Sequence, residues 1–146
     1  MFQGAGTVVH PCVQLLAESG PIIIGENNLI EDNVVIINKN PDGAPLLIGD
    51  GNIFETGCRI EARQIGNRNS VELEAHIGRD VTLGDGCQVG VRQRLLVPEH
   101  IPDRTLIPNC GIRRVAESQE PLQLAVSQLE LLRKLFPNYH ALYKPD

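Results

Sequence analysis

Residues 24–36 read IGENNLIEDNVVI, which places an aliphatic residue at every sixth position, at Ile24, Ile30 and Ile36. The same spacing extends outward from this stretch over most of the chain. We call the residues that carry it anchors; they are Val9, Leu15, Ile24, Ile30, Ile36, Ile48, Phe54, Ile60, Ile65, Val71, Ile77, Leu83 and Val89. A period of six does not keep to one face of a helix with about 3.6 residues per turn. The anchors therefore predict short strands separated by turns.

Six residues per side and three sides per coil account for the whole pattern. The chain then winds into a triangular prism whose anchors point inward in three columns. The columns are Ile24, Ile48, Ile65 and Leu83; Val9, Ile30, Phe54, Val71 and Val89; and Leu15, Ile36, Ile60 and Ile77. This pattern predicts an all-β fold, a parallel β-helix of hexapeptide repeats with about five coils. Its left hand, opposite to the usual crossover, is taken from the resemblance to known hexapeptide prisms.

The β-helix domain is expected to span residues 1–115. Residues 38–47 interrupt the repeat with two prolines and a glycine, which predicts a loop extruded from one corner. Over 95–112 the six-residue spacing decays, and 101–107 is interpreted as the closing segment of the prism.

Residues 116–146 are expected to form a C-terminal amphipathic helix and tail, because apolar residues recur there at steps of three and four. Pro121 suits the first turn of this helix and Pro137 ends it. A lone helix of this length is marginal in water, so it needs a surface to cover, either the prism, which we favour, or a partner. The apolar stripe expected to dock consists of Leu122, Ala125, Leu129, Leu132 and Phe136.

The position four residues after each anchor is expected to point into a tight corner. Its occupants are small residues or asparagines: Val13, Ser19, Asn28, Val34, Asn52, Cys58, Asn69, Ala75, Val81 and Cys87. Asn28, Asn52 and Asn69 fall at one corner of successive coils, where stacked amides can hydrogen-bond along a column. We interpret these asparagines as a structural ladder rather than as catalytic groups. Cys58 and Cys87 are expected to act as small, unreactive apolar residues.

Composition excludes several functional classes. The formal net charge is −5, from 18 acidic and 13 basic residues, which argues against nucleic-acid binding. The 4 cysteines form neither a zinc knuckle nor a disulfide framework. No signal peptide and no apolar run of about 20 residues is present, so membrane insertion is not expected. These features favour a soluble protein of a reducing compartment.

Enzymes built on hexapeptide prisms are the main alternative. A carbonic anhydrase of this fold needs converging histidines with two of them five residues apart, and His10, His76, His100 and His140 offer no such pair. An acyltransferase needs a general-base histidine, for which His76 is the candidate, but no residue at recognisable spacing orients it. We therefore expect no catalytic residue, metal or cofactor. A homotrimer that binds a small ligand between prism faces is a weaker possibility.

Three tetrapeptides of similar sequence occur on successive coils, at 28–31, 52–55 and 69–72. Each ends in a glutamate that follows an anchor and points outward. Glu31, Glu55 and Glu72 should stack about 4.8 Å apart, where like charges repel. One interpretation is a solvated face relieved by Arg59, Arg68 or Arg92, and the other is a docking strip for a basic or polar partner. His10 occupies the equivalent position one coil earlier, next to Glu31.

Four segments carry a resemblance to a known family. Residues 20–31, 52–58, 110–115 and 135–140 (LFPNYH) resemble the dynactin subunit 6 family, which is related to gamma-class carbonic anhydrases, and the similarity runs from about Thr7 to Lys144. The family has roughly one further coil before the Thr7 stretch and a longer loop at 38–47.

The resemblance implies a cytoplasmic, cytoskeleton-associated protein without enzymatic activity. Such a protein would be a scaffold in the pointed-end complex of dynactin, beside the sister prism of dynactin subunit 5. The other pointed-end subunits and the actin-related protein at the filament end would be further partners. The implied role is adaptor and cargo selection for dynein-driven transport along microtubules.

Overall fold

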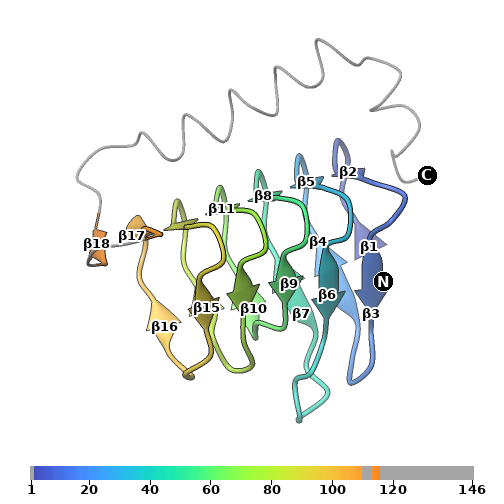
Figure 1. The fold of residues 1–146 in the computed structure, drawn as a ribbon. Helices are drawn as coiled ribbons and strands as arrows, with labels where there is room; N and C mark the ends of the chain where they lie inside the picture. Colours follow the sequence, from blue (N-terminus) through green and yellow to red (C-terminus); the bar gives the residue numbers. More distant parts are fainter. Residues whose placement is uncertain (1, 110–112, 116–146) are drawn as a thin grey trace, which may run out of the picture.

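Three parallel sheets wrap around one axis to form a triangular prism (Figure 1). The computed structural model describes residues 2–109 and 113–115. Sheet A consists of β1 (Phe2–Gln3), β4 (Ile22–Ile24), β7 (Leu46–Ile48), β10 (Gln64–Ile65), β13 (Thr82–Leu83) and β16 (His100–Ile101). Sheet B consists of β2 (Val8–Val9), β5 (Leu29–Ile30), β8 (Ile53–Phe54), β11 (Ser70–Val71), β14 (Gln88–Val89), β17 (Thr105–Ile107) and β18 (Arg114–Val115). Sheet C consists of β3 (Gln14–Leu16), β6 (Val35–Ile37), β9 (Arg59–Ile60), β12 (His76–Ile77) and β15 (Arg94–Leu95).

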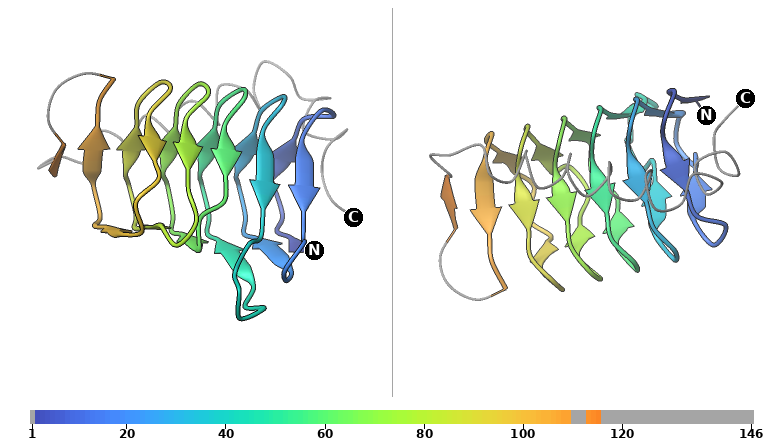
Figure 2. Two further views of the ribbon diagram at one scale, coloured as in Figure 1. Left: turned by 60° about the horizontal axis from the view of Figure 1, so that its bottom comes forward. Right: turned by 90° about the horizontal axis from the view of Figure 1, so that it is seen from above.

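The chain visits the sheets in the order A, B, C, and the coils wind with a left hand (Figures 1 and 2). All strand pairs are parallel except β17 with β18, which is antiparallel. The described residues contain no helix that is long and apolar enough to cross a bilayer. The hexapeptide β-helix predicted from the six-residue repeat is confirmed, and so is the left hand taken from the resemblance to known hexapeptide prisms.

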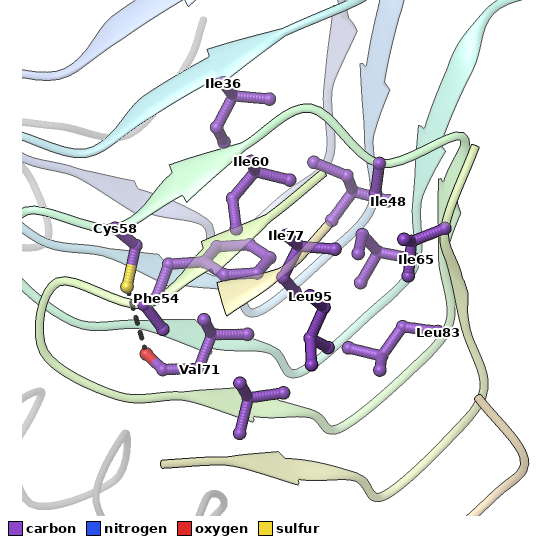
Figure 3. Close-up of a cluster of buried hydrophobic side chains, with 14 of the residues drawn as sticks. Ile36, Ile48, Phe54, Cys58, Ile60, Ile65, Val71, Ile77, Leu83 and Leu95 are labelled. Atoms are coloured by element: carbon purple, nitrogen blue, oxygen red, sulfur yellow. Dashed lines mark hydrogen bonds between the residues drawn. The ribbon is translucent and has the colours of Figure 1, made fainter. Parts of the chain in front are cut away.

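The predicted anchor columns are confirmed by the strand register. Ile24 pairs with Ile48 in sheet A, Ile30 with Phe54 in sheet B, and Ile36 with Ile60 in sheet C. The paired anchors point into the prism and form one continuous core. Figure 3 shows part of it, with side chains from all three sheets converging: Ile36, Ile48, Phe54, Ile60, Ile65, Val71, Ile77, Leu83 and Leu95.

The solenoid has about six turns, one more than the sequence analysis predicted. The first coil was missed because its sheet A strand places Gln3, not an aliphatic residue, in register with Ile24. The spacing also does not decay after Val89, since Leu95 pairs with Ile77 and Ile101 with Leu83. Nearby prolines concealed this last coil, although proline is tolerated at strand ends and turns.

The corner loop is shorter than expected because β7 already begins at Leu46, whose side chain is fully buried. The loop projects beyond the line of the other corners (Figure 2). Two buried asparagines hold it: Asn38 Nδ2 donates to the carbonyl oxygens of Pro21 and Ala44 at 2.8 and 2.9 Å, and Asn40 Nδ2 donates to that of Ala44 at 3.1 Å. The predicted C-terminal helix lies outside the described residues.

Corner residues follow the expected pattern with one exception. Nine of the ten predicted corner residues are buried or half-buried, but Ser19, whose N–H donates to the Asn38 carbonyl at the start of the corner loop, is exposed. The residue three positions after an anchor often has a positive φ, as at Asn27 (58°) and Asn33 (61°). Asparagine tolerates this left-handed conformation better than most residues, so these turns need no glycine.

Candidate functional site

The three glutamates form a column at the corner between sheets B and C. Glu31, Glu55 and Glu72 each follow a buried anchor, and those anchors pair with one another across β5, β8 and β11. All three side chains are partly buried. Glu31 Oε2 accepts hydrogen bonds from the backbone N–H and the hydroxyl of Thr56, both at 3.2 Å. The first glutamate is thus fixed to the next coil of the solenoid.

Negative charge on this column is not neutralised by neighbouring cations. Burial raises the pKa of Glu55, and the adjacent Glu31 and Glu72 raise it further. Of the arginines proposed to relieve the column, Arg59 pairs with Glu61 and Arg92 pairs with Glu74, each at 3.3 Å. No ion pair contacts the column within residues 2–109 and 113–115. The column therefore carries repulsive energy that a basic partner surface would reduce.

His10 lies at the same corner one coil earlier, as expected from the register. Its Nδ1 atom lies 3.4 Å from Asp32 Oδ1, the residue after Glu31. The His10 ring therefore lies beside the carboxylate next to the column.

The three asparagines form a hydrogen-bonded ladder at the corner between sheets A and B, and all are fully buried. Asn28 Oδ1 accepts from the backbone N–H and Nδ2 of Asn52 at 2.8 and 3.0 Å, and Asn52 Oδ1 accepts from the same atoms of Asn69 at 2.9 and 3.0 Å. Each Nδ2 also donates to a glycine carbonyl of the next coil. Thr7 extends the ladder at one end and the Cys87 N–H at the other. Because every polar atom of these amides is used internally, the ladder holds coils together and offers nothing to a ligand.

A second ladder, which the sequence analysis missed, runs parallel to the first along the same corner. Asp50, Asn67, Asp85 and Asp103 each accept a hydrogen bond through Oδ1 from a backbone N–H of the preceding coil, at 2.7 to 2.8 Å. A Cβ atom on Gly49 would overlap the Asn67 oxygen, so the glycine is required by this close approach. The sequence does carry a signal for this second ladder, because an Asp or Asn stands two residues after each of four successive inward residues of sheet A.

An ion cluster on sheet C centres on a buried carboxylate that the sequence analysis also missed. Glu61 is 9% exposed, and its oxygens lie 2.6 Å from Lys39 Nζ, 2.7 Å from His76 Nε2 and 3.3 Å from Arg59 Nη2. Burial raises the pKa of Glu61, but hydrogen bonds from Lys39, His76 and Arg59 outweigh it and lower this pKa to about 2. The cluster ties the corner loop to two strands of sheet C. The expectation that nothing orients His76 was wrong, because Glu61 does so.

At pH 7 we expect Glu61→Gln to lower the free energy of unfolding by about 1–3 kcal/mol, because Lys39, Arg59 and His76 lose an anionic acceptor. The folded pKa of about 2 lies below the ordinary value of 4.5, so the carboxylate stabilises the fold above pH 4.5. That contribution is lost as the pH falls from 4.5 toward 2. Urea titrations at pH 7 and pH 3 measure the difference, with the exposed Glu18→Gln as the control. An equal effect of Glu61→Gln at both pH values would contradict the charge-based explanation.

The remaining candidate catalytic groups are dispersed over the prism. His76 lies on sheet C, whereas His100 lies on sheet A and hydrogen-bonds through Nδ1 to the Thr82 hydroxyl at 3.0 Å. Within the described residues no group of three His, Cys, Asp or Glu side chains could hold a metal ion. Burial raises the pKa of the Cys58 thiol to about 12, and its Sγ contacts the Val71 carbonyl at 3.3 Å (Figure 3). Cys58 is thus a protonated core residue rather than a nucleophile.

Comparison with known proteins decides the family. No protein-family model matches the chain. Dynactin subunit 6 of Danio rerio is 42% identical over 151 residues, covering 97% of this chain and 77% of the relative. The chain belongs to the dynactin subunit 6 family. Members of this family from Nematostella vectensis (39% identical; 97% of this chain, 81% of theirs) and Dictyostelium discoideum (34%; 95% and 76%) match it over a similar range. The resemblance inferred from the sequence is confirmed.

The fold is shared with acyltransferases. LpxA, a UDP-N-acetylglucosamine acyltransferase from Bacteroides fragilis, superposes with a TM-score of 0.51 at 20% identity, covering 95% of this chain and 63% of that one. At this level of identity the likeness shows the fold alone. The dynactin subunit 6 family and this enzyme thus share the hexapeptide β-helix.

Proposed function

We propose that this chain is a non-enzymatic scaffold subunit of the pointed-end complex of dynactin. It would pair with the sister β-helix of dynactin subunit 5, contact the other pointed-end subunits and the actin-related protein at the filament end, and support adaptor and cargo binding for dynein-driven transport in the cytoplasm. The observation that carries this proposal is the similarity to dynactin subunit 6 over 97% of the chain. The candidate catalytic groups are either held by other side chains of the prism, as His76 is by Glu61, or lie on different sheets, as His76 and His100 do, which agrees with a structural role.

The acidic column of Glu31, Glu55 and Glu72, together with His10 at its end, is the proposed partner-binding surface. Its carboxylates are partly buried, mutually repulsive and without ion pairs in the described part of the chain. A partner that brings cations to this corner would remove the repulsion, so that binding and charge neutralisation reinforce each other.

Reversing the charge of the whole column should weaken assembly. We expect Glu31→Lys/Glu55→Lys/Glu72→Lys to reduce affinity for the sister subunit at least about 100-fold, because like charges facing each other across an interface cost several kcal/mol. Light scattering of the full-length chain mixed with dynactin subunit 5 measures complex formation. Far-UV circular dichroism checks that the β-rich signal persists.

Two control variants distinguish an effect of charge at the column from an effect of the change in the net charge of the protein. Glu18→Lys/Glu26→Lys reverses exposed charges elsewhere and should leave assembly intact. Replacing the three column residues with glutamine removes their charge without introducing repulsion and should give an intermediate effect. Unchanged assembly of the triple lysine variant would refute the column as a docking surface, while leaving the family assignment in place.

An acyltransferase is the second candidate function, and the contact between His76 Nε2 and Glu61 at 2.7 Å favours it, since a carboxylate can orient a general-base histidine. Against it, the same carboxylate is engaged by Lys39 and Arg59. Turnover of an acyl-thioester donor by the purified chain, abolished in His76→Ala, would support the enzyme. A stable homotrimer that ignores the sister subunit would point the same way, and stoichiometric zinc would favour a carbonic-anhydrase-like protein instead.

The C-terminal helix is proposed to dock in cis on sheet B. The outward residues of β2, β5 and β8 are Val8, Leu29 and Ile53, which pair with one another and alternate with the inward anchors. They lie outside the core of the prism yet are 2%, 0% and 0% exposed. At the corresponding positions of sheet A, Ile23 and Leu47 are 36% and 40% exposed. We propose that the stripe of Leu122, Ala125, Leu129, Leu132 and Phe136 covers the outward column of sheet B.

A further inference from the structure

The outward surface of sheet C carries a column of basic side chains. Arg59, His76 and Arg94 occupy paired register positions on β9, β12 and β15, and each precedes an inward anchor. Parallel neighbours lie about 4.8 Å apart, so three successive coils place two guanidinium groups and an imidazole in line. The equivalent positions of sheet A are the neutral Leu47, Gln64 and Thr82. In a chain of net charge −5, the basic character of one face is a local feature.

Around β9 and β12 the basic side chains of this face are more exposed than the Glu61 carboxylate beside them, and the carboxylates of the glutamate column lie at its corner with sheet B. The side chain of Glu61 is 10% exposed, whereas that of its partner Arg59 is 45% exposed. Lys39 adds a further positive charge beside Glu61. At the corner beyond, Arg63 and Asp42 pair at 2.8 Å and neutralise each other. The local charge is about +2 when His76 is counted as neutral, because three cations, Lys39, Arg59 and Arg94, oppose the single negative charge of Glu61.

Arg94 at the end of the column has no ion pair within the described residues. Arg94 lies on β15 at the edge of sheet C, and the residue opposite it in the register is His76 rather than a carboxylate. Two residues further on, the corner exposes apolar side chains: Leu96 is 49% and Val97 is 69% exposed. An uncompensated guanidinium beside exposed aliphatic groups is typical of a binding surface.

We propose that the sheet C column binds an acidic, extended protein segment that also carries an apolar side chain. The carboxylates of the segment would pair with Arg59 and Arg94, whose spacing along the prism suits residues of an extended chain, and the apolar side chain would pack on Leu96 and Val97. This surface lies on a different side of the prism from the apolar column of sheet B, and its charge is opposite to that of the glutamate column. The inference thus goes beyond the proposed function by adding a second docking surface of opposite specificity.

The test measures binding of a defined probe to the full-length chain. The probe is a fluorescein-labelled peptide of alternating aspartate and serine with one central leucine, and the readout is fluorescence anisotropy at 50 and 300 mM salt, conditions that bracket physiological screening at about 150 mM. We expect salt-dependent binding that Arg94→Glu weakens at least about 10-fold, because an attractive charge becomes repulsive. The matched control Arg68→Glu changes an exposed arginine at the opposite corner and should bind as the unmodified chain does.

Two further measurements complete the test. Replacing the central leucine of the peptide by serine should weaken binding to the unmodified chain, and the triple lysine variant of the glutamate column should still bind the peptide. Arg94 is exposed, so Arg94→Glu should not affect folding, which the far-UV spectrum verifies. No peptide binding, or equal loss in Arg94→Glu and Arg68→Glu, would overturn the proposal. An oligonucleotide of equal charge that competes as well as the peptide would also overturn it, in favour of a general polyanion surface.

Discussion

Replacing Asn52 with alanine is expected to lower the free energy of unfolding by about 3–4 kcal/mol. The Asn52 amide occupies the centre of the ladder, where Oδ1 accepts two hydrogen bonds from Asn69 and Nδ2 donates one each to Asn28 and Gly66. Alanine removes all four of these hydrogen bonds, each worth about 1 kcal/mol, and leaves the buried Asn69 N–H without its acceptor, which costs about 1–3 kcal/mol. A loss of this size is a large share of the roughly 5–15 kcal/mol that stabilises a typical domain.

The urea midpoint of the full-length chain, followed by far-UV circular dichroism, measures this effect. Gln64→Ala is the matched control, since Gln64 is an exposed amide on β10 at an outward position of sheet A. Removing its side chain should change stability by no more than about 0.5 kcal/mol. A loss below about 1 kcal/mol for Asn52→Ala would mean that the ladder is not a principal link between coils.

The anchor columns could be predicted from the sequence because an inward position in this fold accepts little other than an aliphatic residue. One residue in six then fixes the register of three sheets at once. The predicted number of coils was too small because the first and last coils do not show this aliphatic pattern clearly. Gln3 occupies an anchor position at the open first coil, and the last coil follows prolines, whose rigid turns nevertheless keep the six-residue spacing through Leu95 and Ile101.

The buried cluster around Glu61 was predictable only in part. Glu61 follows Ile60 and His76 precedes Ile77, and these two anchors pair in sheet C, so the register alone brings the two side chains together. Lys39 reaches the same carboxylate from the corner loop. The path of that loop depends on side-chain hydrogen bonds of Asn38 and Asn40, which follow no repeat. The six-residue spacing therefore predicts contacts between residues of successive coils, but not contacts made by the corner loop, which interrupts the repeat.

The structure changes the predicted pairing of charges on the outer faces. Two of the three arginines that were expected to relieve the glutamate column pair elsewhere, Arg59 with Glu61 and Arg92 with Glu74. The reason is geometric. Arg59 lies on a sheet C strand, where it and Glu61 point outward on either side of Ile60 and contact each other, whereas Glu55 follows a sheet B strand and stays at the corner.

The last prediction concerns the outward apolar column of sheet B. We expect Ile53→Asp to lower the free energy of unfolding by more than about 3 kcal/mol, because it places an unpaired carboxylate at a fully buried position. Leu47→Asp is a closely matched control. It makes the same chemical change at an outward strand position of the same coil, but Leu47 is 40% exposed, so the loss should stay near 1 kcal/mol or below. Urea titration of the two full-length variants measures the contrast.

A double-mutant cycle tests what covers Ile53. If the proposed stripe packs on this column, Leu129→Asp alone should also destabilise the chain, whereas Ser127→Asp, on the opposite side of the predicted helix, should have little effect. The combination of Ile53→Ala with Leu129→Ala, which introduces no charge, should then cost less than the sum of the two alanine changes by about 1 kcal/mol or more, because one contact is lost only once. Strict additivity would mean that Leu129 does not contact this face, and that another part of the chain covers Ile53.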